Sequence, residues 1–135
     1  MPGGRVLILT ADVGHGHVAA GLAVAEDLRR LGCDVELTDG LFAFGAVARH
    51  VIRDGYRVQM RVAPWSYDAM YALMTHVPWL PRAGERVLSA LARRRLRRLV
   101  HEHAPDVVVT THPALTAVLG RMRLHRRLRV HCARR

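Results

Sequence analysis

Two histidines stand in a short glycine-containing segment near the start of the chain, and their type and spacing suit proton transfer. The segment spans residues 11–17 and reads ADVGHGH. A histidine with an ordinary pKa accepts a proton near neutral pH, and its ring is also a common metal ligand. General base catalysis needs one such ring close to the hydroxyl that loses its proton. His15 and His17 are therefore candidate proton acceptors.

The glycines of the same segment allow a ligand to approach the backbone closely. Gly14 and Gly16 lie just before an expected helix, whose first N–H groups are free to bind an anion. The spacing matches neither the dinucleotide fingerprint, because position 19 is Ala, nor the phosphate loop that ends in Gly-Lys-Ser/Thr. A tight structural turn and a phosphate-binding loop remain equally open. Only Asp12 accompanies the histidines as a possible ligand, so we expect no metal site.

A third histidine, His112, follows a second apolar segment and is joined to Pro113. If both apolar segments are parallel strands of one sheet, the carboxyl ends of the strands place His112 at the same sheet edge as the glycine loop. It then faces the same cleft. The alternative is a structural role, in which His112 caps the helix that begins at Pro113.

The elements that must position these residues alternate between strand and helix. Residues 5–10 (RVLILT) form a continuous apolar run typical of a buried parallel strand. A helical pattern follows and ends before Gly32, and residues 34–39 predict a second strand, nearer a sheet edge. Residues 106–111 predict a third strand. The order predicts an α/β, Rossmann-like, doubly wound parallel sheet. We do not expect the tail HCARR to form a further strand.

The middle of the chain, about residues 42–103, is expected to be helical. An amphipathic helix is predicted from Phe42, a short one from Trp65, and a long one over about Arg82–His103, after a proline-containing break at 78–81. Most of the chain's aromatic residues lie here, and we interpret them as core-forming. The alternative is an exposed apolar surface for a lipid or a partner. The arginines of the long helix predict a solvated basic face rather than a nucleic-acid site.

Composition limits the class of protein. The chain has 135 residues, is 50% hydrophobic and carries a formal net charge of +10, with arginine as its only basic residue besides histidine. These values favour one folded domain and exclude intrinsic disorder. No apolar run is long enough to cross a bilayer, and the two cysteines favour a reducing, cytoplasmic setting. The charge favours an anionic partner, such as phosphorylated ligands, acidic lipids or nucleic acid.

In several segments the sequence resembles the amino-terminal domain of the monogalactosyldiacylglycerol synthase-like glycosyltransferases. These include bacterial diacylglycerol glucosyltransferases and are related to glycosyltransferase family 28. The resemblance lies in VLILTADVGHGH at 6–17, then in Asp39, Gly55-Tyr56 and Ala63-Pro64-Trp65, and finally in PDVVVTTHP at 105–113. It covers most of the chain in the same order.

The resemblance implies the acceptor half of a two-domain enzyme with GT-B architecture. Such an enzyme moves a hexose from a nucleotide sugar, of UDP type, to a diacylglycerol-type lipid, without a resident cofactor. It implies that His17 activates the acceptor hydroxyl, that Gly14, His15 and Gly16 lie near the donor diphosphate, and that His112 and Pro113 line the acceptor side. It also implies contact of the helical region with an anionic membrane, at the inner face of the cell membrane, through Tyr56, Trp65, Tyr67, Trp79, Arg86, Arg93 and Arg97.

The chain departs from this pattern by its length. We expect residues 1–135 to be a single acceptor-binding domain of a truncated or split enzyme, without a donor domain and with negligible turnover alone. Electrostatic stabilisation of the leaving diphosphate would then be missing. A separate donor-domain chain is a possible partner. A non-catalytic module that binds lipid or a partner is the alternative, and nucleic-acid binding is less favoured because no recognition motif is present.

Overall fold

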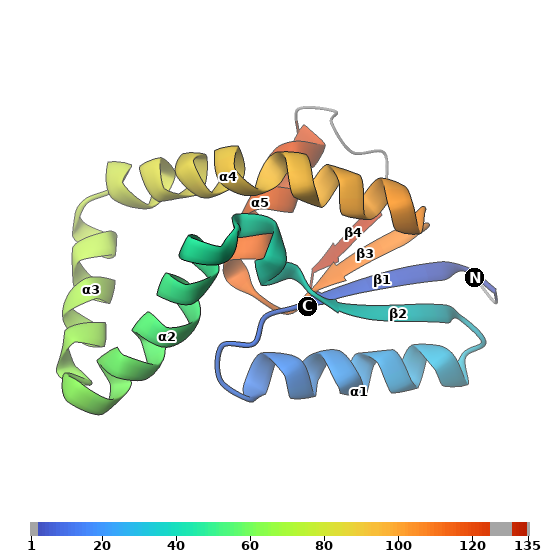
Figure 1. Ribbon diagram of the computed structural model, residues 1–135, viewed down its shortest axis with the longest axis horizontal. Coiled ribbons are helices and arrows are strands. Elements are labelled where there is room, and N and C mark those ends of the chain that lie inside the picture. The colour runs from blue at the N-terminus through green and yellow to red at the C-terminus, as the bar shows by residue number, and fades with distance from the viewer. Residues whose placement is uncertain (1–2, 125–130, 135) are drawn as a thin grey trace.

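The computed structural model describes residues 3–124 and 131–134, which form an α/β domain around a parallel sheet. The sheet has four strands in the described part of the chain: β1 (Arg5–Thr10), β2 (Asp34–Asp39), β3 (Val107–Thr110) and β4 (His131–Arg134). Their spatial order is β2-β1-β3-β4, and every neighbouring pair is parallel (Figure 1). The predicted Rossmann-like parallel sheet is confirmed, with β2 at an edge.

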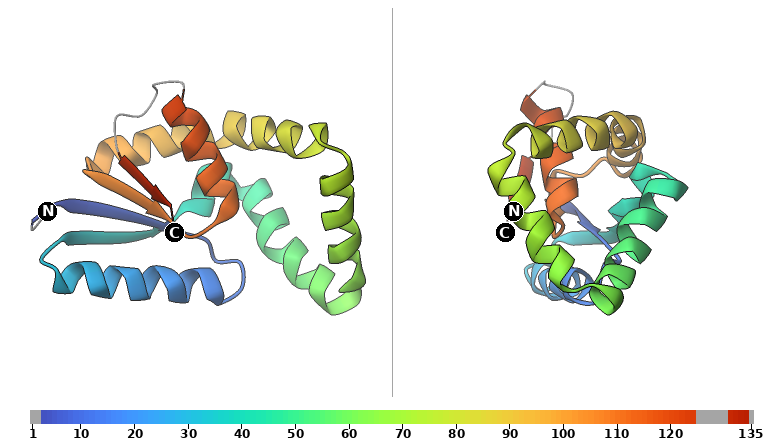
Figure 2. Two further views of the ribbon diagram at one scale, coloured as in Figure 1. Left: turned by 180° about the vertical axis from the view of Figure 1, so that it is seen from behind. Right: turned by 90° about the vertical axis from the view of Figure 1, so that its left-hand side faces the viewer.

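Helices cover both faces of the sheet because alternate residues of β1 point to opposite sides. Val6 and Ile8 pack with Ala25 of α1 (Gly16–Arg30) on one face. Leu7 and Leu9 belong to the larger core on the other face. Gly21 brings α1 close to β1, since a Cβ at this position would meet the Thr10 side chain. The sheet is thus doubly wound, as the alternation of elements predicts (Figure 2).

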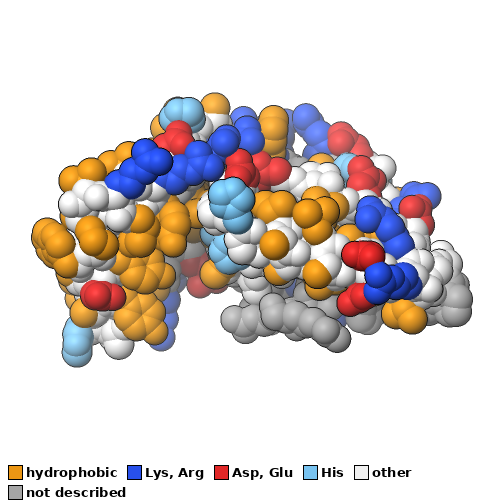
Figure 3. Space-filling view, turned by 90° about the horizontal axis from the view of Figure 1, so that it is seen from below, with side chains coloured by type: hydrophobic (Ala, Val, Ile, Leu, Met, Phe, Trp, Pro, Cys, Tyr) orange, Lys and Arg blue, Asp and Glu red, His pale blue; other side chains and the backbone are white. Residues whose placement is uncertain are grey.

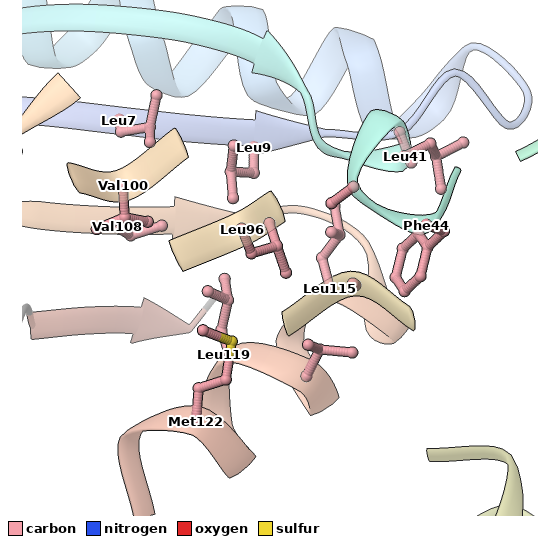
Figure 4. Packing of buried hydrophobic residues seen from close by; sticks show 14 residues of the cluster. Leu7, Leu9, Leu41, Phe44, Leu96, Val100, Val108, Leu115, Leu119 and Met122 are labelled. Atoms are coloured by element: carbon pink, nitrogen blue, oxygen red, sulfur yellow. The ribbon is translucent and has the colours of Figure 1, made fainter. Parts of the chain in front are cut away.

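The larger core joins the sheet to α4 (Trp79–His103), α5 (Pro113–Leu124) and the short 3-10 helix η1 (Gly40–Phe44). Figure 4 shows these side chains converging between the three elements and the sheet. Complete burial of a leucine stabilises the folded state by about 1.5–3 kcal/mol. The leucines with 0–1% exposure are the main contributors to this core: Leu7, Leu9, Leu41, Leu96, Leu115 and Leu119.

Three helices between β2 and β3 form a frame that extends beyond the sheet. They are α2 (Ala46–Val62), α3 (Trp65–His76) and the first half of α4, and Figures 1 and 2 show them at the end of the molecule away from the chain's N-terminus. Neither α2 nor α3 has a fully buried residue. The apolar residues of this frame therefore cannot be the principal core of the domain.

The interpretation of the aromatic segment as core-forming is wrong. Trp65, Tyr71 and Trp79 are each about two-thirds exposed, and Phe44 is the buried exception. Figure 3 shows the hydrophobic side chains gathered at the α3 end of the molecule, with basic side chains beside them. The periodicity of the segment correctly indicates helices. It does not reveal whether the apolar side of a helix meets other parts of the same domain.

Three predicted boundaries also need correction. Phe42 lies in η1, and α2 starts only after Gly45, whose φ of 88° interrupts the helical path. The long helix begins at Trp79 rather than Arg82, since Pro81 fits in a first turn where backbone N–H groups have no intrahelical partner. The tail does form a strand, because residues 131–134 pair with β3. Within the described residues, no helix has the length and apolarity that crossing a membrane requires.

Candidate functional site

The strand order reverses between β1 and β3, so the chain segments that follow these two strands leave the sheet in opposite directions. From β1 the chain passes to its neighbour β2 through α1, whereas β3 on the other side of β1 leads into α5. In open α/β sheets, ligands bind at such a reversal, outside the carboxyl ends of the strands. The loop after β1 carries His15 and His17, and the loop after β3 carries His112. The candidate site therefore lies between β1 and β3.

The glycine loop leads directly into α1. Gly14 has a φ of 67°, in the left-handed region that glycine adopts more readily than other residues. His15 follows it and is the residue immediately before α1. His15 is exposed and makes no side-chain cap on the helix. A Cβ built on Gly14 or Gly16 would meet no atom within 4 Å. The loop is thus open at both glycines, and the first N–H groups of α1 lack a side-chain cap.

His17 and Thr111 are joined by two hydrogen bonds across the reversal point. His17 Nδ1 lies 2.7 Å from the Thr111 carbonyl oxygen, and Thr111 Oγ1 donates to the His17 carbonyl oxygen at 3.0 Å. A carbonyl oxygen only accepts, so the proton of the neutral ring is on Nδ1. Nε2 of His17 then has a free lone pair. This is the arrangement that a general base requires.

His112 lies against His17, and it also caps α5. The two ring centroids are 4.9 Å apart in an edge-to-face arrangement. The backbone N–H of Ala114 donates to His112 Nδ1 at 3.2 Å. Burial and the neighbouring His17 lower the pKa of His112 to about 4, so the ring is neutral at pH 7. The structure thus places His112 beside His17 at the glycine loop and also makes it the cap of α5.

A row of arginines on α2 holds the loops of the site, and sequence reasoning missed it. Arg53 contacts the Asp12 carboxylate of the glycine loop at 3.0 Å, and Arg57 is 4.0 Å from it. One turn earlier, Arg49 pairs with Asp39 at the end of β2 at 3.0 Å. The spacing of four residues, visible in the sequence, places these arginines along one side of a helix. It gives no indication of which carboxylates they meet.

The residues predicted to contact a membrane lie apart from the histidine pair. Tyr56 of α2 and Tyr67 of α3 make a ring contact, with centroids 6.4 Å apart. Trp65 and Trp79 are the first residues of their helices and are exposed. Spacings of seven and eleven residues place Trp79 and three exposed arginines along one face of α4: Arg86, Arg93 and Arg97. In the described part of the chain, no hydrogen bond, ion pair or ring contact joins this group to His17 or His112.

Pro113 is the first residue of α5 and follows His112 directly. Proline fits there because its missing N–H would have no intrahelical partner. The described residues contain no group of three or more His, Cys, Asp or Glu side chains suited to a metal ion. What the site does offer is an imidazole with a free lone pair, a second neutral imidazole and an open glycine loop.

Comparison with known proteins gives two matches. Residues 15–133 match the family model of monogalactosyldiacylglycerol (MGDG) synthase. Over 123 residues, the chain is 27% identical to a processive diacylglycerol beta-glucosyltransferase of Bacillus subtilis (strain 168). This alignment covers 90% of the chain but 32% of the relative, so the chain spans about a third of that protein's length. No solved structure matches significantly.

Proposed function

Because the chain belongs to the monogalactosyldiacylglycerol synthase family, we propose that it forms the acceptor-binding part of a glycolipid glycosyltransferase. The complete enzyme moves a hexose from a nucleotide sugar to the free hydroxyl of a diacylglycerol-type lipid. The observation that carries this proposal is the hydrogen bond between His17 Nδ1 and the Thr111 carbonyl oxygen. It orients the ring and leaves Nε2 as the base.

The transfer needs a base because a lipid hydroxyl is a weak nucleophile at neutral pH. As the hydroxyl oxygen bonds to the anomeric carbon of the sugar, its proton passes to His17 Nε2. The bond between that carbon and the nucleotide diphosphate breaks, and the diphosphate leaves with the electron pair. Positioned general bases typically accelerate such steps by about 10²–10⁴-fold. The Thr111 carbonyl stabilises the protonated ring that results, since Nδ1–H continues to donate to it.

The glycine loop is suited to the donor diphosphate. Gly14 and Gly16 leave open space, and the first N–H groups of α1 supply hydrogen-bond donors and a favourable helix dipole. His15 is exposed at the same helix end. This part of the site approaches the diphosphate from the acceptor side. The rest of the nucleotide binds to a donor domain, in the remainder of the same protein or in a separate chain.

The exposed frame of α2, α3 and α4 is suited to the surface of a membrane. Tryptophan and tyrosine are favoured at membrane interfaces because they combine an apolar ring with a polar group. Trp65, Trp79 and Tyr71 are exposed there, and the arginine face of α4 provides charge for anionic headgroups. We propose peripheral binding at the inner face of the cell membrane, with the lipid acceptor entering from the bilayer.

Flotation with lipid vesicles tests this function. The chain is mixed with phosphatidylcholine vesicles that contain phosphatidylglycerol, with or without diacylglycerol. We expect binding that increases with both additions. The double variant Trp65→Ser/Tyr71→Ser should lose most of it, whereas Leu22→Ser/Leu31→Ser, which changes exposed apolar residues of and next to α1, should bind normally. Equal loss in both variants, or binding indifferent to diacylglycerol, contradicts the proposal.

The 135 residues by themselves should show negligible transfer, because the proposed enzyme divides donor and acceptor between two domains. This is tested with a UDP-sugar and diacylglycerol-containing vesicles. Addition of a family donor domain should restore transfer. Robust transfer of sugar to diacylglycerol by the purified 135-residue chain contradicts this division of labour.

A further inference from the structure

His17 and His112 have opposite tautomers, and this difference follows from their partners. His17 Nδ1 faces a carbonyl oxygen, which can only accept, so that nitrogen bears the proton. His112 Nδ1 faces the backbone N–H of Ala114, which can only donate, so the proton of the neutral ring lies on Nε2. One ring therefore presents a bare Nε2 and the other an Nε2–H.

These two Nε2 atoms are the ring nitrogens that the fold leaves for a ligand. Neither has a hydrogen-bond partner among residues 3–123, whose side chains the structure describes. The rings lie 4.9 Å apart at an interplanar angle of 68°. Both come from loops at the carboxyl ends of adjacent strands, β1 and β3, where ligands bind in open sheets. An acceptor nitrogen and a donor nitrogen are thus available at one place.

We propose that His112 is a second catalytic residue of this site, whose Nε2–H donates a hydrogen bond to the same lipid hydroxyl oxygen that His17 deprotonates. The inference deepens the proposed function and depends on it. A hydroxyl has one proton to donate and lone pairs that accept. Its proton points to His17 Nε2, one lone pair accepts from His112, and the other is directed at the anomeric carbon.

The assignment gives each ring a distinct role in the transfer. The hydroxyl proton moves to His17, the oxygen bonds to the sugar, and the nucleotide diphosphate leaves with the electrons of the broken bond. His112 keeps its proton throughout. Its hydrogen bond strengthens as negative charge develops on the oxygen, which stabilises the transition state. Burial keeps this ring uncharged at neutral pH, so it does not repel the His17 ring when that ring gains a proton.

A purely structural role for His112 predicts different results, because its two nitrogens do different things. Asparagine at position 112 retains a side-chain oxygen that accepts from the Ala114 N–H, and it is a favoured helix cap. It lacks a donor at the position of Nε2. Glutamine places an amide N–H near that position and caps less well. His112→Asn therefore separates the cap from the proposed hydroxyl contact, and His112→Gln is the matched donor-retaining variant.

The test measures the affinity of each variant for 1,2-dihexanoylglycerol, a short-chain diacylglycerol, by NMR titration of the purified chain. His112→Asn should fold with an unchanged melting temperature and bind about 3- to 10-fold more weakly, the range expected for one hydrogen bond. His112→Gln should bind within about twofold of the unmodified chain. Unchanged affinity in His112→Asn, or equal losses in both variants, overturns the inference.

The same titration separates this inference from the proposed function. In ¹⁵N-labelled chain, His112 should show the Nε2–H tautomer, and its signal should shift together with that of His17 when dihexanoylglycerol is added. A shift of His17 without His112 overturns the role of His112 and leaves the proposed function intact. An absence of response from both rings contradicts the proposed function itself.

Discussion

His17 and Thr111 bond to each other in both directions, although 94 positions separate them in the sequence. The ring of His17 donates to the Thr111 carbonyl, and the Thr111 hydroxyl donates to the His17 carbonyl. The pair links the first turn of α1 to the end of β3, across the point where the sheet reverses direction. The backbone carbonyl of Thr111 therefore orients the His17 ring, whereas its hydroxyl binds the backbone of α1.

Thr111→Val tests this separation because valine keeps the shape and the backbone carbonyl but removes the hydroxyl. We expect a loss of about 1 kcal/mol in the free energy of unfolding, since one hydrogen bond to the His17 carbonyl is removed. The tautomer of His17 should not change. Urea denaturation measures the first effect and ¹⁵N NMR of the ring the second. A switch of His17 to the Nε2–H tautomer contradicts the separate roles.

The stability of the domain should depend on His112 between pH 4 and 6.5. Its pKa falls from 6.5 to about 4 on folding, because of burial and the nearby His17. Between these values the unfolded chain binds more protons, so stability is present above pH 6.5 and is lost as the pH falls toward 4. The loss is about 1–3 kcal/mol after allowance for solvent screening. His112→Gln should remove it in urea titrations at pH 7 and 4.5.

His103 provides a control, because folding shifts its pKa in the opposite direction from that of His112. Its pKa is raised, mainly by the hydrogen bond to the Leu99 carbonyl and further by Glu36. A raised pKa contributes stability that is complete below pH 6.5 and is lost as the pH rises through the folded value. His103→Gln should therefore leave the decline between pH 6.5 and 4 in place. If both variants change the profile alike, the decline does not come from His112.

Asp12→Asn should loosen the glycine loop with little effect on the whole fold. The ion pairs with Arg53 and Arg57 are partly exposed, and such pairs contribute at most about 1 kcal/mol. We expect a decrease of about that size in the free energy of unfolding and faster hydrogen exchange at Val13 and Gly14. Asp54→Asn is the control, because the Asp54 carboxylate lies on α2 but contacts His50 instead of an arginine. Unchanged loop exchange in Asp12→Asn means that α2 does not hold the loop.

Arg86→Glu/Arg93→Glu should abolish flotation with vesicles that contain phosphatidylglycerol. Both side chains are exposed on α4, and the double reversal turns their attraction for anionic headgroups into repulsion. Arg29→Glu/Arg30→Glu changes the net charge equally on α1, on the opposite face of the sheet. It should reduce binding far less. Flotation that falls equally in both variants indicates an effect of net charge rather than of the α4 face.

The strands and helices are predictable because local patterns determine them. The apolar run of β1 and the glycines around α1 indicate a parallel unit by themselves, and the order of the strands puts His112 at the same sheet edge as His17. The tail strand is harder to predict because pairing with β3 defines it, and its few residues carry no pattern of their own. Pro81 misleads the prediction of the α4 start, since proline ends a helix and also fits its first turn.

Partners distant in the sequence are beyond prediction. The contact of Arg53 with Asp12 and the choice between a buried and an exposed aromatic segment both depend on tertiary packing. Helical periodicity finds an apolar side and says nothing of what covers it. The tautomers of His17 and His112 likewise follow from backbone groups at Thr111 and Ala114, whose approach only the folded chain defines.

The most direct test of the account is the ¹⁵N signal of His17 Nε2 during titration with two lipids. 1,2-Dihexanoylglycerol has a free hydroxyl, and trihexanoylglycerol has the same chains but none. If His17 accepts the proton of a lipid hydroxyl, its Nε2 signal is that of an unprotonated nitrogen and shifts with the first lipid alone. An Nε2–H signal in the free chain, or equal shifts with both lipids, contradicts the assignment of His17 as the base.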